Sequence, residues 1–270
     1  MSKDAKILRR YSIMAGIIFL VALLVPFILT EDPYASVMQN AFLPPSAEHW
    51  FGTDKLGRDL FTRVIYGARI SIFMALTVVI LIAGVGSLIG VVSGYVGGKV
   101  DTVIMRLADM FLAFPGIVLA IAIAGMMGGS IVNAILALVA VGWTKYARLA
   151  RSVALKIRQQ DYISAAITSG TRPRDMLIRH VVPNIIPIVL VTAAMDIGAM
   201  MMELAGLSFL GFGAQPPTPE WGLMLNEGRQ SLQTAPWLMM FPGAAIVIVV
   251  AVFNLWGDAL RDYLDPRKAN

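Results

Sequence analysis

The sequence has 270 residues, of which 57% are hydrophobic and only 14% are charged, whereas a soluble domain carries roughly 25% charged residues. The charge-poor residues form long uninterrupted stretches, which only a bilayer tolerates on a protein's surface, so the composition excludes a soluble globular protein. The absence of cysteine excludes disulfides, thiolate metal sites and a cysteine nucleophile. The net charge of +5 is better explained by membrane topology than by a nucleic-acid partner, because no separate basic patch stands out.

Charge-poor stretches predict six transmembrane helices. The first, over residues 11–30, follows a basic start, is longer than a signal-peptide core and has no A-x-A-like cleavage site after it. Between Asp109 and Lys145 about 35 uncharged residues are too many for one helix, and the glycines of residues 125–130 supply a turn. The other five helices are therefore predicted over residues 70–98, 102–127, 131–150, 184–205 and 236–257.

The distribution of basic residues predicts the orientation. With the N-terminus in the cytoplasm, seventeen of the 22 lysines and arginines lie inside, and both termini are cytoplasmic by the positive-inside rule. The five that lie outside are Lys55, Arg58, Arg63, Arg69 and Arg229. We expect residues 1–69 to form an N-terminal transmembrane helix with an extracytoplasmic segment, and residues 70–270 to form a core of five transmembrane helices.

Glycines recur at every fourth position near the end of the second predicted helix. On a helix such a spacing makes a smooth stripe along which a second helix can approach closely. We therefore expect a helix-packing surface at Gly86, Gly90, Gly94 and Gly98.

The longest inside loop, about residues 148–183, carries the largest positive cluster. Residues 161–169 have helical character, and Gly170 interrupts them. A second short helix is predicted after the glycine, because Pro173 and Asp175 are favourable in a first helical turn. Two short helices thus meet at a glycine on the cytoplasmic side.

These residues resemble a motif of permease subunits of binding-protein-dependent ABC importers: Glu-Ala-Ala, three residues, Gly, nine residues, Ile-x-Leu-Pro. Serine, histidine and valine replace its glutamate, isoleucine and leucine here. In that family the segment is the coupling helix that docks into the ATPase subunit. The resemblance implies a coupling role for Ser164, Ala165, Ala166, Gly170, His180 and Pro183.

The resemblance covers nearly the whole chain and narrows to the dipeptide/oligopeptide/nickel branch, where it points to the second ("C") of two permease subunits. Four segments are similar to that branch, at residues 49–59, 105–115, 206–222 and 254–266. It implies an all-α type I ABC importer permease fold, a bacterial inner membrane location, and peptides, nickel or metal chelates as cargo. The implied partners are a second homologous permease subunit, an extracytoplasmic substrate-binding protein and two cytoplasmic ATPase subunits.

The resemblance also implies that ATP and Mg bind to the ATPase subunits, with no cofactor in this chain. The nearest lookalike of a phosphate-binding loop, at residues 94–100, lacks the first glycine at the required spacing and the Ser or Thr after the lysine. We therefore expect the chain itself not to be an enzyme.

Two acidic residues lie within the fifth predicted span. Asp196 and Glu203 are seven residues apart and share one helical face, and a charge at such depth costs about 2.5–3.5 kcal/mol on insertion scales. Either they line or gate a pathway for a cationic or zwitterionic substrate, together with Met200, or they form buried interhelical hydrogen bonds. Metal ligation by methionines 200–202 is disfavoured, since consecutive residues point to different faces.

Other polar residues have simpler interpretations. Asp109 is expected to pair with Arg106, three residues earlier on the same helix, and His49 and His180 are not expected to be ligands. Residues 215–222 either contact the binding protein or form a rigid connector.

The sequence disfavours two other classes of protein. An intramembrane enzyme would need an H-E-x-x-H motif, paired intramembrane aspartates or a Ser–His dyad, and the sequence contains no such arrangement. A secondary transporter would predict internal repeats, and none is visible.

Overall fold

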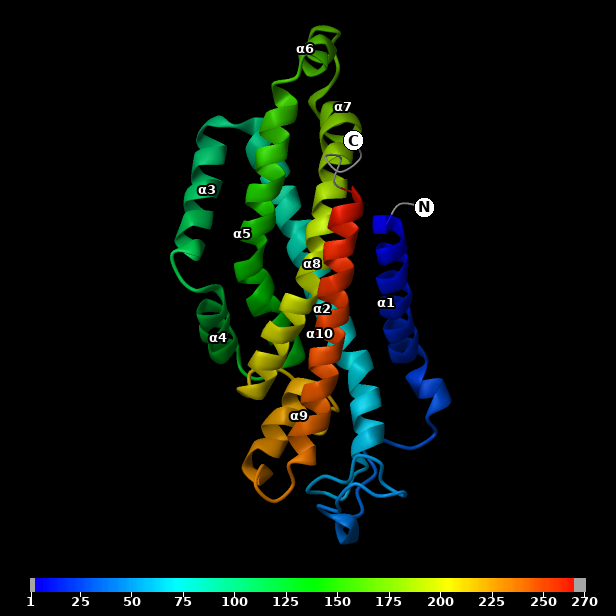
Figure 1. Cartoon of the computed structure of the whole chain (residues 1–270). Helices are drawn as coiled ribbons and strands as arrows, with labels where there is room; N and C mark the ends of the chain where they lie inside the picture. Colours follow the sequence, from blue (N-terminus) through cyan, green and yellow to red (C-terminus); the bar gives the residue numbers. More distant parts are fainter. Residues whose placement is uncertain (1–2, 265–270) are drawn as a thin grey trace. The chain divides into compact units, whose positions relative to one another are not determined.

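The computed structural model describes residues 3–264, apart from the side chains of residues 3, 25, 26, 28, 164, 167 and 173. Over these residues the chain is helical, and its only β pairing is an isolated bridge between Thr53 and Asp59. The long helices are α1 (Lys3–Ile28), α2 (Leu60–Val96), α3 (Gly98–Leu112), α4 (Gly116–Met127), α5 (Ile131–Arg158), α8 (Val182–Phe209) and α10 (Trp237–Leu264) (Figure 1). The short helical segments are η1 (Met38–Asn40), α6 (Asp161–Thr168), α7 (Pro173–Met176), η2 (Leu177–Val181), α9 (Trp221–Gly228) and η3 (Arg229–Ser231).

The chain divides into two compact units. Unit 1 comprises Met1–Thr77, Ile123–Leu136 and Ala194–Asn270, and unit 2 comprises Val78–Ala122 and Ala137–Ala193. Helices α2, α4, α5 and α8 each contribute residues to both.

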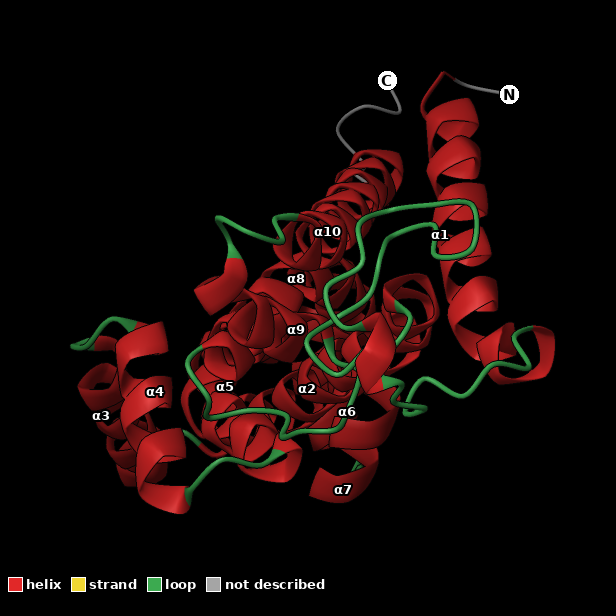
Figure 2. Cartoon of the chain, turned by 90° about the horizontal axis from the view of Figure 1, so that it is seen from below, coloured by secondary structure: helices red, strands yellow, loops and turns green. Residues whose placement is uncertain are grey.

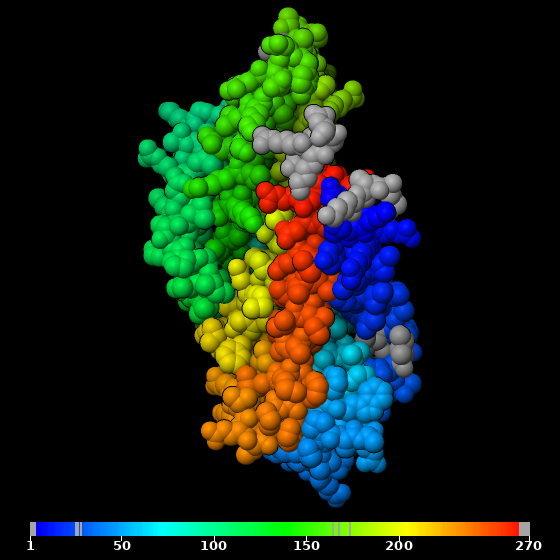
Figure 3. Space-filling model, viewed as in Figure 1, coloured from blue at the N-terminus to red at the C-terminus, as the bar shows by residue number. Residues whose placement is uncertain are grey.

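In unit 1, α1 packs along α10, as Figures 1 and 2 both show. The indole Nε1 of Trp256 on α10 donates a 3.0 Å hydrogen bond to Ser12 Oγ on α1. Figure 3 shows the two helices as adjoining blue and red-to-orange bands on one face. Most of α1 is exposed: only 11% of an 18-residue apolar stretch within Asp4–Leu24 is buried, as expected for a helix that meets lipid or another subunit.

The end of α8 also packs closely on α10 within unit 1. A Cβ added at Gly257 would lie 2.8 Å from the Cα of Met195, and one added at Gly198 would overlap the side chain of Asn254. Glycine is needed at both positions because a larger residue would push the two helices apart.

Four described helices are long and apolar enough to cross a membrane. They are Asp4–Leu24, Leu60–Val96, Arg174–Phe209 and Trp237–Leu264, and they become five if α3 and α4 together make one span. Helix α5 exists, but its second half carries Lys145, Arg148 and Arg151 and it does not meet the same test. The number of six spans therefore stays a prediction.

The expectation of one continuous helix over residues 102–127 was wrong. The chain turns by 89° between α3 and α4. Pro115 has no backbone N–H, and its ring disfavours the helical conformation at Phe114, so the helix stops there.

Candidate functional site

The segment between α5 and α8 forms an elbow at Gly170, in unit 2. Helix α6 ends with the N–H of Thr171 donating to the carbonyl of Ala166 at 3.1 Å, and Gly170 adopts φ +81°. This combination is the C-terminal motif in which a left-handed glycine closes a helix. The residues expected to give two short helices at a glycine do so, as α6 and α7.

One side of the elbow is anchored by an apolar cluster. Ile163 of α6, Met176 of α7 and Val181 are at most 1% exposed and pack with Ala154 and Ile157 of α5. Burying side chains of this size contributes roughly 1.5–3 kcal/mol each. The elbow is thus held to the end of α5.

The opposite side of the elbow is free for a partner. Tyr162, Ala165, Arg172, Arg174 and Ile178 are exposed. Ala166 is half-buried at the edge of the apolar cluster, and the side chain of Ser164 lies outside the described residues. A surface that combines small side chains with basic ones is suited to a shallow acidic groove on another protein.

His180 and Pro183 lie beyond the elbow, where the helical hydrogen bonding changes from the α to the π type and back. The ring of half-buried His180 lies 6.0 Å from that of Tyr162, and Asn184 Nδ2 donates to the His180 carbonyl at 2.6 Å. Residues Leu177–Val181 form a π-helical turn that ends two residues before Pro183. The wider turn accommodates a proline, whose ring would otherwise clash with the carbonyl four residues earlier.

Three of the four stripe glycines bring α2 against α5, also in unit 2. A Cβ at Gly86 would overlap the carbonyl oxygen of Trp143, one at Gly90 that of Ala147, and one at Gly94 would lie 2.9 Å from the Cβ of Ala154. Gly98 differs from these: it is the first residue of α3, has φ +59°, and has open space where a Cβ would be.

Ion pairs join α3 to α5 alongside this contact. Arg151 donates from Nε and Nη2 to the two oxygens of Asp101, both at 2.5 Å, and Ser93 Oγ donates to the same carboxylate. Asp109 pairs with Arg148 of α5, so the expected pair with Arg106 was wrong. The sequence could not show this, because α5 is distant in sequence and only the packing brings it near.

The candidate pathway residues lie on the part of α8 that belongs to unit 1. Asp196, Met200 and Glu203 are all half-buried, and Asp196 and Glu203 each take part in an interaction. Of the neighbouring methionines, Met201 is buried and Met202 is 54% exposed, so they point in different directions. No cluster of His, Cys, Asp and Glu suited to a metal ion occurs between residues 3 and 264, leaving aside the undescribed side chains.

The comparisons with known proteins decide the family. Residues 86–270 match the family described as the inner membrane component of binding-protein-dependent transport systems. The chain belongs to this family. The match includes the elbow at Gly170, and family membership implies binding-protein and ATPase partners.

Individual relatives cover nearly the whole chain. It is 44% identical to the dipeptide transport system permease protein DppC of Alkalihalophilus pseudofirmus, over 92% of this chain and 82% of that one. It is 43% identical to the probable D,D-dipeptide transport system permease protein DdpC of Escherichia coli, over 95% and 86%. It is 41% identical to the nickel transport system permease protein NikC of Escherichia coli, over 94% and 92%.

A solved structure shows the same fold. A chain of the MetNI methionine ABC transporter, in an inward-facing conformation, aligns with a TM-score of 0.56 and 18% identity over 76% of this chain and 98% of that one. The chain is therefore a multi-pass permease subunit of an ABC importer with the type I permease fold.

The permease carries a buried ion cluster within unit 1, between the segment before α2 and α9, that sequence reasoning missed. Arg58 Nε donates to Asp54 Oδ2 at 2.6 Å, and Glu227 of α9 lies 3.4 Å from Arg58 and 3.3 Å from Arg63. Arg58 and Arg63 are 2% and 1% exposed. The i,i+4 spacing of Asp54 and Arg58 was a visible signal, but Glu227 is too far away in sequence to be recognised as their partner.

Glu220 caps α9 from a buried position in unit 1. Its oxygens accept from the N–H groups of Gly222 at 2.9 Å and Leu223 at 2.8 Å, and from Ser71 Oγ at 3.1 Å. Burial raises the pKa of the carboxyl group above its usual value, and the hydrogen bonds oppose the shift only in part.

Residues 215–222 were expected either to contact the binding protein or to form a rigid connector, and different parts of the segment fit each expectation. Residues 219–222 are buried, and Trp221 Nε1 donates to the Val64 carbonyl at 2.8 Å, as a rigid connector requires. Pro216 and Pro217 are exposed and stay available to a partner.

Proposed function

We propose that this permease forms half of the translocation pathway of an ATP-driven importer, beside a second, homologous permease subunit. The family match over residues 86–270 is the observation that carries the proposal. The relatives named as permease proteins of dipeptide and nickel transport systems support the transport role, and the second permease subunit is proposed from the resemblance.

The elbow formed by α6 and α7 is the segment that we propose docks into the ATPase subunits. Two such subunits would bind ATP with Mg and, on closing, draw the coupling segments of the two permeases together. The residues to which we assign the coupling role are Ser164, Ala165, Ala166, Gly170, His180 and Pro183. The apolar cluster and the glycine contact between α2 and α5 support this role, because a force applied to the elbow moves packed helices rather than a loose loop.

The proposed topology has both termini and the elbow in the cytoplasm, with six spans in all. Residues 1–69 would be an N-terminal helix with an extracytoplasmic segment, and residues 70–270 the core. An extracytoplasmic binding protein would deliver cargo to the outer side, where Pro216 and Pro217 are exposed.

For cargo, we propose a peptide, or nickel or another metal chelate, in line with the named relatives. Asp196, Met200 and Glu203 would line the pathway, and the two carboxylates suit a cationic or zwitterionic substrate. Uptake of a labelled dipeptide and of radioactive nickel by cells with and without the permease separates the two cargo classes. Asp196→Asn is expected to lower uptake of the true cargo.

Two glycines provide a matched test of coupling. Gly170 (φ +81°) and Gly128 (φ +88°) both have open space where a Cβ would lie, so Gly170→Val and Gly128→Val impose the same kind of backbone strain, about 1–2 kcal/mol. Gly170→Val is expected to lose ATPase co-purification and ATP-driven uptake while its membrane content stays normal. Gly128→Val is expected to keep both ATPase co-purification and ATP-driven uptake.

Normal transport by the Gly170→Val variant would overturn the coupling role. Equal loss in both variants would also do so, since it would show only a general effect of strain.

A further inference from the structure

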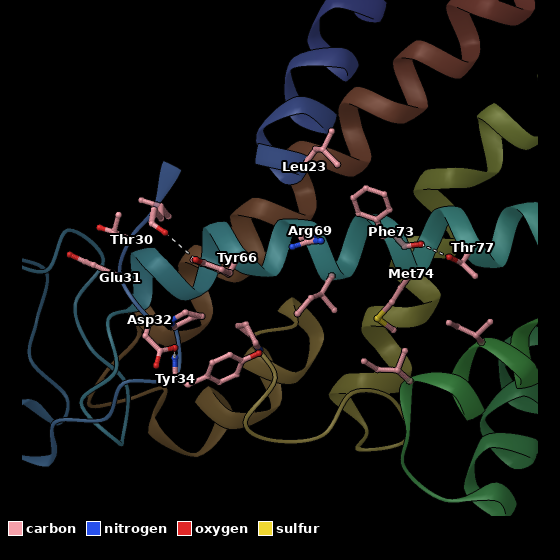
Figure 4. Close-up of a pocket in the computed structure, with 16 residues that line it drawn as sticks. Leu23, Thr30, Glu31, Asp32, Tyr34, Tyr66, Arg69, Phe73, Met74 and Thr77 are labelled. Atoms are coloured by element: carbon pink, nitrogen blue, oxygen red, sulfur yellow. Dashed lines mark hydrogen bonds between the residues drawn. The ribbon is translucent and has the colours of Figure 1, made fainter. Parts of the chain in front are cut away.

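Unit 1 contains a pocket between the end of α1, the loop that follows it and the first half of α2. Its volume is about 1120 Å³. Figure 4 shows Leu23 of α1 on one side of α2, and Asp32 and Tyr34 of the loop on the other. A hydrogen bond of 3.1 Å from Tyr66 Oη to the Leu29 carbonyl ties the loop to α2.

Arg69 supplies a cation on the wall of this pocket. Its side chain is exposed and, within residues 3–264, has no hydrogen-bond or ion-pair partner. It stands directly before Ile70, where the charge-free stretch of α2 begins, so it lies at the predicted outer boundary of the membrane. An arginine in such a place needs an anionic partner or water.

Acidic and aromatic residues line the same end of the pocket. Glu31 accepts from Thr62 Oγ1 at 2.8 Å with one oxygen, and Asp32 accepts from the Tyr34 N–H at 2.9 Å with one oxygen. Tyr34 and Tyr66 also line it, and tyrosine is enriched at the level of lipid headgroups. This end therefore offers both charge signs at headgroup level.

The rest of the pocket is apolar. Its wall is formed by Leu23, Ile70, Phe73, Met74, Ile131 and Ile135. A hydrocarbon chain can pack against such a wall, whereas the amides of a peptide would find no hydrogen-bond partners on it.

We infer that this pocket binds one phospholipid with a zwitterionic headgroup, a phosphate joined to a primary ammonium. The phosphate pairs with Arg69, the ammonium lies at Glu31 and Asp32, and an acyl chain runs along Leu23 and Phe73. This assignment gives the planar guanidinium a phosphate, whose oxygens it can bind through two parallel N–H groups. An apolar helix of a second subunit would leave that charge unpaired.

Native mass spectrometry of the assembled transporter tests the site. The transporter is purified from its membrane and exchanged into nanodiscs that contain equal amounts of phosphatidylethanolamine and phosphatidylglycerol. The wild-type complex is expected to retain phosphatidylethanolamine. Arg69→Gln is expected to weaken that retention at least about tenfold, the size of effect of losing one charge-assisted hydrogen bond.

Matched variants separate the site from general effects. Arg229→Gln removes another exposed outer arginine that does not line the pocket, and it is expected to change nothing. Arg69→Lys keeps the charge and is expected to retain most of the binding, which guards against a misfolded Arg69→Gln variant. Glu31→Gln with Asp32→Asn is expected to abolish the preference for phosphatidylethanolamine over phosphatidylglycerol.

Three results would overturn the inference. Retention could be the same in Arg69→Gln and wild type. Phosphatidylglycerol could bind equally well to the wild type. A structure of the assembled transporter could show a protein helix in the pocket and no lipid.

Discussion

Glu220 makes the stability of unit 1 around α9 depend on pH. Burial raises the pKa of its carboxyl group above 4.5, so the folded chain binds this proton more tightly than the unfolded chain does. The stabilisation from this group is complete below about pH 4.5 and falls as the pH rises through the folded-state pKa.

Glu220→Gln is therefore expected to flatten the fall in melting temperature that the wild type shows as the pH rises above about 4.5. The glutamine keeps one oxygen for one of the two N–H groups that Glu220 caps, at a cost of about 1 kcal/mol. Thermal unfolding of the purified protein measures both effects, with the exposed Glu48 changed to Gln as the control. Parallel profiles for wild type and Glu220→Gln would contradict the prediction.

The buried ion cluster gives a second prediction at the residue scale. Arg58→Met removes a positive charge that balances the nearly buried carboxylates of Asp54 and Glu227. Breaking such a buried cluster costs about 3–5 kcal/mol of folding stability. Lys55→Met removes a 48% exposed lysine 3.6 Å from the same Glu227 and is expected to cost less than about 1 kcal/mol. Denaturant or thermal unfolding compares the two, and equal losses would mean that the burial of Arg58 is unimportant.

At the scale of helices, the contact between α2 and α5 depends on where each glycine lies. Gly90→Ala places a methyl group against the Ala147 carbonyl, and overpacking of this kind costs about 1–3 kcal/mol. Gly84, on the same helix, has nothing within 4 Å of an added Cβ, so Gly84→Ala is expected to stabilise by about 0.5–1 kcal/mol. Melting temperatures that fall together in both variants would show that helix propensity, not packing, is responsible.

Two features of the helices could not be predicted from the sequence pattern. The charge-poor stretches located the helices, but the bend at Pro115 was overlooked, because the apolar run continues through it while the proline ends the hydrogen bonding. The stripe ending at Gly98 was extended one position too far, because glycine spacing does not reveal that α2 has already ended at Val96.

At the scale of the whole molecule, the absence of native cysteine permits a clean test of topology. Single cysteines at exposed Gln160, before the elbow, and exposed Glu48, in the segment after α1, can each be labelled with a membrane-impermeant maleimide. We expect Glu48→Cys to react in intact spheroplasts and Gln160→Cys to react only after the membrane is broken. Labelling of both from the same side would contradict the proposed orientation.

The sequence by itself determined the class of molecule, its family and the elbow at Gly170. These properties depend on composition, local spacing and backbone conformation, which a single chain displays without reference to its folded partners. Tertiary structure decided which charges meet: Asp109 with Arg148, Asp101 with Arg151, and Glu227 with Arg58 and Arg63. It also decided that Arg69 faces a pocket instead of a partner. Pairings of this kind depend on long-range packing, because residues distant in sequence become neighbours only when the helices assemble.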